Sequence, residues 1–189
     1  MKKLISLVLA AALVLAAAPA FAEETETETV YRGVLEWKTY AEQIGAAGIQ
    51  GKYYTLEGIH VSFWVPPYLE LKEPEDRAKT YRETGMLGAF ESESGDMGFI
   101  ISLFGMPVNS MDEYIRAIDE AGAEDGRRYL INGLDAYSYV YDDVMILAFL
   151  AGEEGILVFS FYTNTDERFI TDASIIAASI RPYDPQQEE

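Results

Sequence analysis

The 189-residue sequence contains no cysteine and only one histidine, His60. Without cysteine the chain forms no disulfide bonds, even if it is exported, and it offers no thiol for a lipid anchor. A triad built on a single histidine would need Ser or Thr as its nucleophile, and the G-x-S-x-G motif of serine hydrolases is missing. We therefore expect no catalytic histidine and place His60 in a half-buried strand.

Basic residues are also scarce. Only Lys2 and Lys3 of the 14 basic residues precede position 23, and all 32 acidic residues lie at or after it, so the remainder carries 12 − 32 = −20 charges. A surface of this sign repels phosphates and anionic lipids, so nucleic acid is rejected as a partner. The charge is typical of a soluble protein, and attraction of cations or basic partners is the functional alternative.

Long hydrophobic runs are confined to the start of the chain. Lys2 and Lys3 precede an apolar run over 4–18, and Ala20-Phe21-Ala22 has the small-x-small form of a signal-peptidase site. This pattern predicts a bacterial-type secretory signal peptide over 1–22. The mature protein would then begin at Glu23, be secreted or extracytoplasmic, and keep no membrane anchor.

The remaining sequence predicts one domain between two polar ends. The acidic segment 23–32 predicts a disordered linker, and 184–189 predicts a disordered tail. A single domain over 33–183 is long enough to bury a sizeable core. Helical periodicity, with a capping box at Ser110–Glu113, predicts helices at 36–47, 111–121 and 166–180. Alternating and β-rich runs predict strands at 52–56, 59–65, 86–90, 97–104, 127–131, 135–141, 144–151 and 156–163.

Hairpin signals join most of these strands, so we expect a mainly antiparallel sheet. With Asp142-Asp143 and Glu153-Glu154 as turn centres, both faces of the sheet are apolar and need a cover of helices. We therefore predict an α+β fold, a three-layer α/β/α sandwich. One face would carry Tyr137, Tyr139, Tyr141, Ile146, Ala148, Phe159 and Phe161, and the other Ala136, Val140, Met145, Leu147, Phe149 and Val158.

The three tyrosines of the first face permit two interpretations. An exposed aromatic stripe could stack sugars or bind a peptide, whereas a covered stripe would pack beneath a helix. Because Phe159, Phe161 and Ile146 share the predicted face, we favour the core. We accordingly expect Tyr139 and Phe161 to be buried together beneath one helix.

Four segments between residues 59 and 181 form a recognisable pattern: FWVPP (63–67), SMDEYI (110–115), ING (131–133) and ASIRP (178–182). By these segments the chain resembles, over about two thirds of its length, the PsbP-like family, whose fold is shared with the Ran-binding nuclear-import protein. No catalytic signature lies among them. Photosystem assembly and Ran binding have no motif here, and a secreted, strongly acidic chain argues against both. The resemblance implies a binding or accessory module, by analogy of fold.

These observations predict a secreted, soluble, non-catalytic binding or accessory module that binds no cofactor. Its partner would be a protein or a cell-surface ligand. One alternative is an extracytoplasmic glycoside hydrolase that uses two carboxylates. Its candidate acids all fall in predicted turns, at Glu91, Glu93, Asp96, Asp142, Asp143, Glu153 and Glu154. Another alternative is a weak calcium-dependent module at 91–96, although the EF-hand pattern is missing.

The segment 68–84 is charged, and we interpret it as a loop that could include one helical turn. Together with the preceding Trp64, it combines rigid aromatic residues with four basic ones, the types that dominate interface energetics. The candidate partner-binding residues are Trp64, Tyr68, Arg77 and Arg82. The alternative is a solvated connector whose Trp64 closes the edge of the core.

Overall fold

The computed structural model describes residues 31–152, 155–162 and 166–183. The predicted signal peptide, the linker up to residue 30 and the tail 184–189 lie outside these residues. The last two linker positions, Tyr31 and Arg32, belong to the folded unit, because the Arg32 amide donates a hydrogen bond to the Arg128 carbonyl at 2.7 Å. The domain therefore begins slightly earlier than the predicted residue 33.

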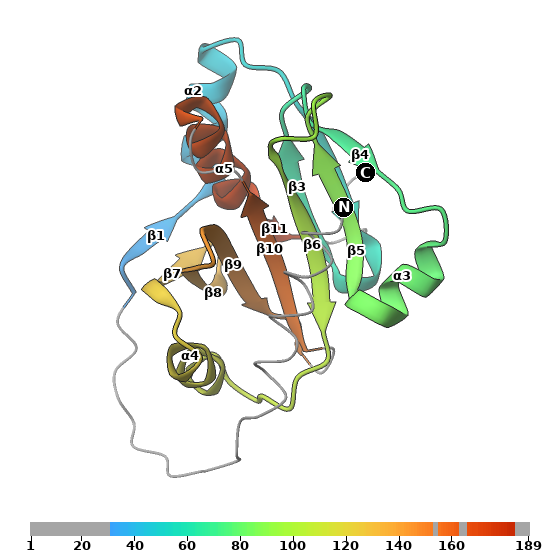
Figure 1. The fold of residues 1–189 in the computed structure, drawn as a ribbon. Helices are drawn as coiled ribbons and strands as arrows, with labels where there is room; N and C mark the ends of the chain where they lie inside the picture. The colour runs from blue at the N-terminus through green and yellow to red at the C-terminus, as the bar shows by residue number, and fades with distance from the viewer. Residues whose placement is uncertain (1–30, 153–154, 163–165, 184–189) are drawn as a thin grey trace.

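The described residues form one large, mainly antiparallel sheet (Figure 1). Its order is β1-β7-β8-β9-β10-β6-β5-β4, and only β1 runs parallel to its neighbour, β7. The strands are β1 (Gly33–Leu35), β4 (Glu70–Lys72), β5 (Met86–Glu91), β6 (Gly98–Phe104), β7 (Glu124–Ile131), β8 (Leu134–Tyr141), β9 (Val144–Leu150) and β10 (Ile156–Tyr162). The predicted hairpins are confirmed, whereas the short edge strands β1 and β4 carry no sequence pattern that predicts them.

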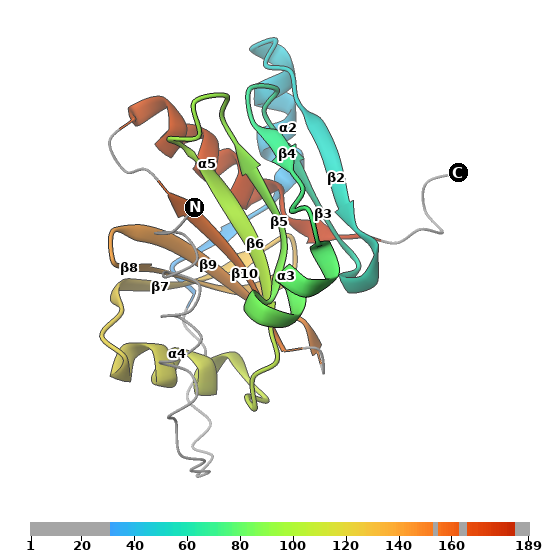
Figure 2. The same ribbon diagram turned by 45° about the vertical axis from the view of Figure 1, so that its right-hand side comes forward.

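Helices and a small sheet cover the two faces of the large sheet. The small sheet has the order β11-β3-β2, and the 3₁₀ turn Glu57–Ile59 joins its strands β2 (Lys52–Leu56) and β3 (Val61–Val65). Helix α4 (Met111–Glu120) packs on one face, and α5 (Glu167–Ser179) lies on the other with α2 (Trp37–Ala46) and the small sheet (Figures 1 and 2). The fold is the predicted α+β three-layer sandwich, with β11 (Arg181–Pro182) closing the small sheet.

Two tight turns set the register of β7, β8 and β9. Asn132 and Gly133 have φ angles of 49° and 83°, and Asp142 and Asp143 have 48° and 62°. Positive φ at both central positions matches the right-handed twist of the flanking strands, and Asn, Asp and Gly tolerate it best. The turn residues read from the sequence are thereby confirmed.

The predicted register of β10 is wrong by one residue. Ile156 pairs with Leu150 and Val158 pairs with Ala148, so the connection has an odd number of residues. Because side chains alternate along a strand, a shift of one residue moves all of them to the other face. Phe159 and Phe161 therefore lie on the face opposite the tyrosines, and Val158 lies on the same face as the tyrosines. The predicted turn centre, Glu153 and Glu154, lies outside the described residues.

The tyrosine face is core, beneath α4. Tyr137 and Tyr139 are each 5 % exposed and pack with Met111, Tyr114 and Ile118. Their polar ends are satisfied, since the Tyr139 hydroxyl is 2.8 Å from that of Tyr114 and the Tyr137 hydroxyl donates to Asp119 at 2.7 Å. Phe161 is buried on the opposite face with α5. The expectation that Tyr139 and Phe161 share one helix is wrong.

The charged segment before β5 also differs from its prediction. It contains β4 and an eight-residue helix, α3 (Arg77–Thr84), where a loop was expected. Asp76 accepts a hydrogen bond from the Lys79 amide at 2.9 Å, and Gly85, at φ 70°, ends the helix in the left-handed conformation. Because α3 buries none of its residues, it shows no apolar periodicity by which the sequence could reveal it.

His60 is exposed and lies in a turn, not in a half-buried strand. It follows the 3₁₀ turn with φ 55°, and β3 begins one residue later. The alternation around His60 suggested that the strand begins at Ile59, but the left-handed residue interrupts it.

Asn132 links three segments that are distant in sequence. Its side-chain oxygen accepts a hydrogen bond from the Trp37 amide at 2.6 Å, at the start of α2. Its side-chain nitrogen donates to the carbonyls of Ala178 and Ile180 at 2.8 and 2.7 Å, at the end of α5. The side chain thus caps α2 and fixes both helices to the β7–β8 turn.

We expect Asn132→Ala to lower the free energy of unfolding by about 2–4 kcal/mol, from three lost hydrogen bonds and a left-handed residue that alanine adopts poorly. Asn132→Gly separates these contributions, because glycine keeps the backbone conformation. The glycine variant should recover about 1 kcal/mol of the loss. Urea unfolding of the three proteins measures both effects, and a loss below about 0.5 kcal/mol for alanine would contradict the linking role.

Candidate functional site

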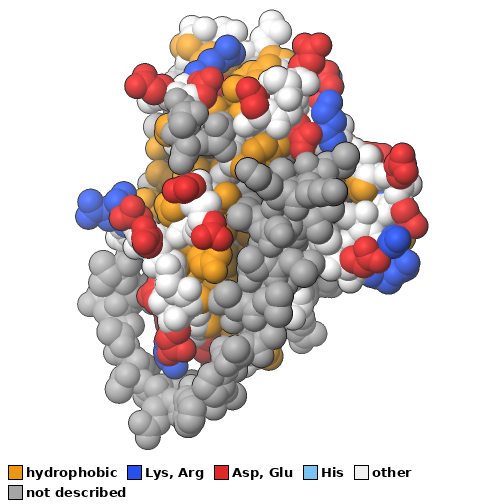
Figure 3. Space-filling view, viewed as in Figure 1, with side chains coloured by type: hydrophobic (Ala, Val, Ile, Leu, Met, Phe, Trp, Pro, Cys, Tyr) orange, Lys and Arg blue, Asp and Glu red, His pale blue; other side chains and the backbone are white. Residues whose placement is uncertain are grey.

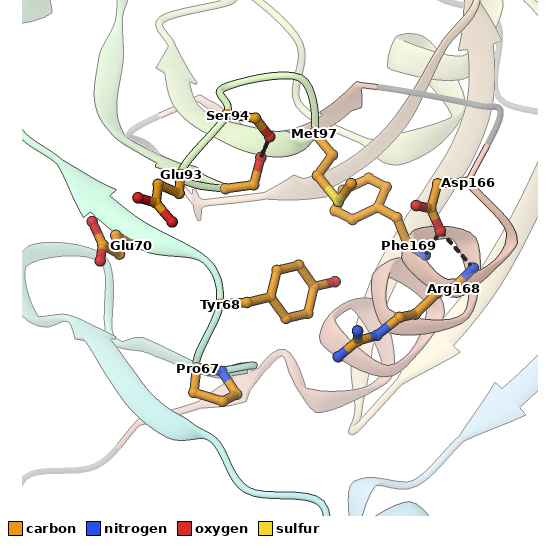
Figure 4. A pocket seen from close by; sticks show the side chains of 10 residues that line it. Pro67, Tyr68, Glu70, Glu93, Ser94, Met97, Asp166, Arg168 and Phe169 are labelled. Atoms are coloured by element: carbon orange, nitrogen blue, oxygen red, sulfur yellow. Dashed lines mark hydrogen bonds between the residues drawn. The ribbon is translucent and has the colours of Figure 1, made fainter.

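A cleft of about 650 Å³ opens where three segments meet (Figure 4). They are the chain leading into β4, the β5–β6 loop and the first turn of α5, and Figure 2 shows the last two side by side. The cleft is lined by Pro67, Tyr68, Glu70, Ser92, Glu93, Ser94, Met97, Asp166, Arg168 and Phe169. Its volume falls within the range of small-molecule and side-chain binding sites.

Tyr68 lies in the turn before β4 and projects across the cleft towards α5 (Figure 4). Its hydroxyl donates a hydrogen bond to Asp172 Oδ2 at 2.6 Å, and this fixes the ring. The Arg168 guanidinium lies over the ring, with Cζ 4.9 Å from the centroid. Burial of the hydroxyl, together with the neighbouring Asp172 carboxylate, raises the pKa of Tyr68 well above its usual range. Tyr68 therefore presents a neutral aromatic face at physiological pH.

The carboxylates around the cleft are not arranged as a catalytic pair. Lys72 donates a hydrogen bond to Glu70 at 2.9 Å, and this bond lowers the pKa of Glu70. Asp166 caps α5, because its Oδ1 accepts hydrogen bonds from the backbone amides of Arg168 and Phe169 at 2.9 and 3.2 Å. A glycosidase needs one carboxyl with a raised pKa to protonate the leaving group. The pKa of Glu70 is lowered, so this carboxyl is not the raised-pKa acid that a glycosidase needs.

The β5–β6 loop directs its polar groups at one another. Ser92 and Ser94 donate hydrogen bonds to Asp96 Oδ1 at 2.9 and 2.6 Å, and these bonds lower the pKa of Asp96. Within the described residues, no group of three or more His, Asp and Glu side chains is placed to hold a metal ion.

The four predicted partner-binding residues do not form one surface. Trp64 is 4 % exposed and packs against Trp37, which agrees with the alternative that it closes the core. Tyr68 lines the cleft, whereas Arg77 and Arg82 are exposed on α3 and are not among its lining residues. The sequence did not indicate Met97, Arg168 or Phe169, which lie near Tyr68 only after folding.

A smaller apolar groove of about 280 Å³ lies on the other side of the first turn of α5. Its lining includes Val140, Met145 and Phe161 of the large sheet, and Ile170, which is 48 % exposed. Phe169 lines both this groove and the main cleft. No helix among the described residues is long and apolar enough to cross a membrane.

Comparison with known proteins identifies the fold. The sequence matches no known family profile, and no curated protein matches it. The solution structure of cyanobacterial PsbP (CyanoP) from Synechocystis sp. PCC 6803 superposes with a TM-score of 0.50 and 12 % sequence identity. The match covers 71 % of this chain and 94 % of that one. The protein therefore has a PsbP-like fold, as predicted; the link to the Ran-binding protein stays a prediction.

Proposed function

We propose that this protein is a secreted, non-catalytic binding or accessory module, and that the cleft around Tyr68 receives its partner. The observation that carries the proposal is the composition of the cleft. It combines an oriented tyrosine ring with the side chains of Met97 and Phe169. Aromatic residues and methionine are among the side chains enriched where proteins bind one another.

The charges around the cleft favour recognition over hydrolysis. Glu70 is paired with Lys72, and Asp166 is engaged as a helix cap, so neither is held in the protonated form that an acid catalyst needs. Tyr68 is occupied as a hydrogen-bond donor to Asp172. We therefore propose that the protein is not an enzyme.

Export and an acidic surface support a partner outside the cytoplasm. The sequence over 1–22 has the pattern of a secretory signal. Figure 3 shows Asp and Glu side chains spread over the visible face, with Lys and Arg mainly at its margins. Such a surface disfavours nucleic acid and anionic lipid, so we propose a protein or cell-surface ligand as the partner.

Filling the cleft tests this function. Ser94 is an exposed lining residue, so Ser94→Trp should occupy the cleft at little cost to folding. The matched control is Ser174→Trp, at an exposed position of α5 outside the lining. We expect wild type and the control to capture the same partner from the culture in which the protein is made, and Ser94→Trp to capture it at least tenfold less, about 1.4 kcal/mol.

Equal melting temperatures for the two tryptophan variants would confirm that folding is preserved. Equal capture by all three proteins would mean that the partner binds elsewhere and would contradict the proposed site. Turnover of a substrate by the wild type, lost in Ser94→Trp, would instead show that the cleft is catalytic.

A further inference from the structure

The side chain that stacks on the Tyr68 ring, Arg168, indicates which chemical group a ligand would place there. We propose that the cleft binds the guanidinium group of an arginine on a peptide partner, and that Arg168 is an internal occupant which this arginine displaces. The inference rests on the proposed function, because it assigns a ligand class to the same cleft. Its first support is the stacking of Arg168 on Tyr68, at 4.9 Å from the ring centroid.

Arg168 is held loosely enough to be displaced. Its side chain is 79 % exposed, and its Nε lies 3.9 Å from Asp172 Oδ2, beyond hydrogen-bond distance. Ion pairs and cation–π contacts at such exposed positions contribute little to stability, and Arg168 can turn into solvent without uncovering the core. The Arg168 guanidinium therefore shows where a cation binds on the Tyr68 ring, but it is held there only weakly.

Tyr68 and Asp172 form a more permanent receptor than Arg168 does. The Asp172 side chain is only 13 % exposed, and the Tyr68 hydroxyl bonds it at 2.6 Å. This bond keeps the ring in place, and the same carboxylate lies 3.9 Å from Arg168 Nε, so a guanidinium stacked on the ring has a buried carboxylate nearby. A guanidinium is planar, weakly hydrated and able to stack on an aromatic ring while pairing with a carboxylate.

The walls of the cleft suit the remainder of an arginine side chain and its peptide. Met97 lies over Phe169 and forms an apolar wall beside Tyr68, against which the methylene stem of arginine can pack (Figure 4). Glu93 and Asp166 contribute negative charge to the lining, and Lys72 partly offsets the charge of Glu70. A chain with a charge of −18 also attracts basic peptides at long range.

The smaller groove beside Phe169 extends this interpretation to the neighbours of the arginine. Its lining is apolar apart from Asp143, and it shares Phe169 with the main cleft. A leucine next to the bound arginine could reach this groove across the first turn of α5. The probe should therefore be an arginine flanked by leucines.

The experiment titrates the purified protein with acetyl-Leu-Arg-Leu-amide and with the same peptide carrying citrulline, which keeps the shape of arginine but has no charge. We expect the arginine peptide to bind at least fivefold more tightly. We expect Arg168→Ala to bind it about two- to fivefold more tightly than wild type, because the internal competitor is removed. Tyr68→Leu should weaken binding of the arginine peptide at least fivefold.

Equal affinity for the two peptides, or weaker arginine binding after Arg168→Ala, would overturn the inference. Arg168 is exposed, so its replacement leaves the fold intact and keeps the result interpretable even if Tyr68→Leu is unstable. The proposed function has a separate measure: if Ser94→Trp abolishes capture of the natural partner while the arginine peptide does not bind, the site stands and its ligand class is wrong.

Discussion

Raising the pH above 10 is expected to unfold this protein cooperatively, before pH 12 is passed. Burial raises the pKa of Tyr139 to about 12, above the value of about 10 that is usual for a tyrosine in water. The folded protein therefore retains a proton that the unfolded chain loses above pH 10. The stability from this residue is complete below pH 10 and is lost as the pH rises through 12, a change of about 3 kcal/mol.

Tyr139 does not act alone. Burial raises the pKa of Tyr114, whose hydroxyl meets that of Tyr139, well above its usual range, and the pKa values of Tyr68, Tyr137 and Tyr162 are raised for the same principal reason. All five shifts have the same sign, so their losses accumulate over the same interval of pH. A domain of this size has about 5–15 kcal/mol of stability, which several buried phenolates would exhaust.

Circular dichroism and tyrosinate absorbance, followed together from pH 9 upwards, test this expectation. Tyr139→Phe removes one titrating group, so between pH 9 and pH 11 this variant should lose about 1 kcal/mol less stability than wild type. The matched control is Tyr81→Phe, which removes a hydroxyl from a residue that is 41 % exposed. Ionisation of all 13 tyrosines while the circular dichroism remains that of the folded protein would contradict the burial of these hydroxyls.

Local signals predicted the greater part of the fold. Ser110 accepts the Glu113 amide at 3.2 Å, so the capping residue and the following apolar spacing locate α4 from adjacent residues alone. The Asn132-Gly133 turn likewise needs only its own two residues to define a hairpin. At these two places the signal lies within a few residues, and sequence and structure agree.

The errors arise where geometry depends on distant or unpatterned residues. The register of β10 depends on whether its connection to β9 is odd or even, which composition does not reveal. The cleft is still less visible, because Tyr68 and Asp172 are 104 positions apart and Arg168 reaches the ring from a different layer. The local sequence pattern therefore indicates Tyr68 but not Asp172 or Arg168, which contact it only after folding.

The segments that carried the family resemblance prove to be structural. The Ser179 hydroxyl accepts the Trp64 amide at 2.8 Å, while Asn132 bonds the carbonyls on either side of Ser179. The segments FWVPP, ING and ASIRP thus meet at the end of α5. The residues that these segments share with the family join parts of the fold to one another. The resemblance therefore predicted the architecture and did not predict a ligand.

Phe63→Ala is expected to cause the largest loss of stability among single substitutions in the small sheet. Phe63 is fully buried on β3, and its ring lies within 5.4–6.2 Å of the rings of Tyr54, Phe90, Phe99 and Phe159, measured between centroids. Phe90, Phe99 and Phe159 belong to the large sheet, so this one ring joins the two sheets. Removing a buried aromatic ring costs the lost burial and the cavity that remains.

The loss should be about 3–5 kcal/mol and should lower the melting temperature by about 6–20 °C. Phe63→Leu is the graded control, since it fills most of the cavity and should cost about 1–2 kcal/mol. Urea unfolding at neutral pH measures both variants, away from the tyrosine titration. A cost below about 1 kcal/mol for alanine would mean that the small sheet is not packed on the large one. Phe63 is not a lining residue of the cleft. If Phe63→Ala still binds its partner after refolding in a stabilising salt, the contacts of the Phe63 ring support the cleft only through the stability of the fold.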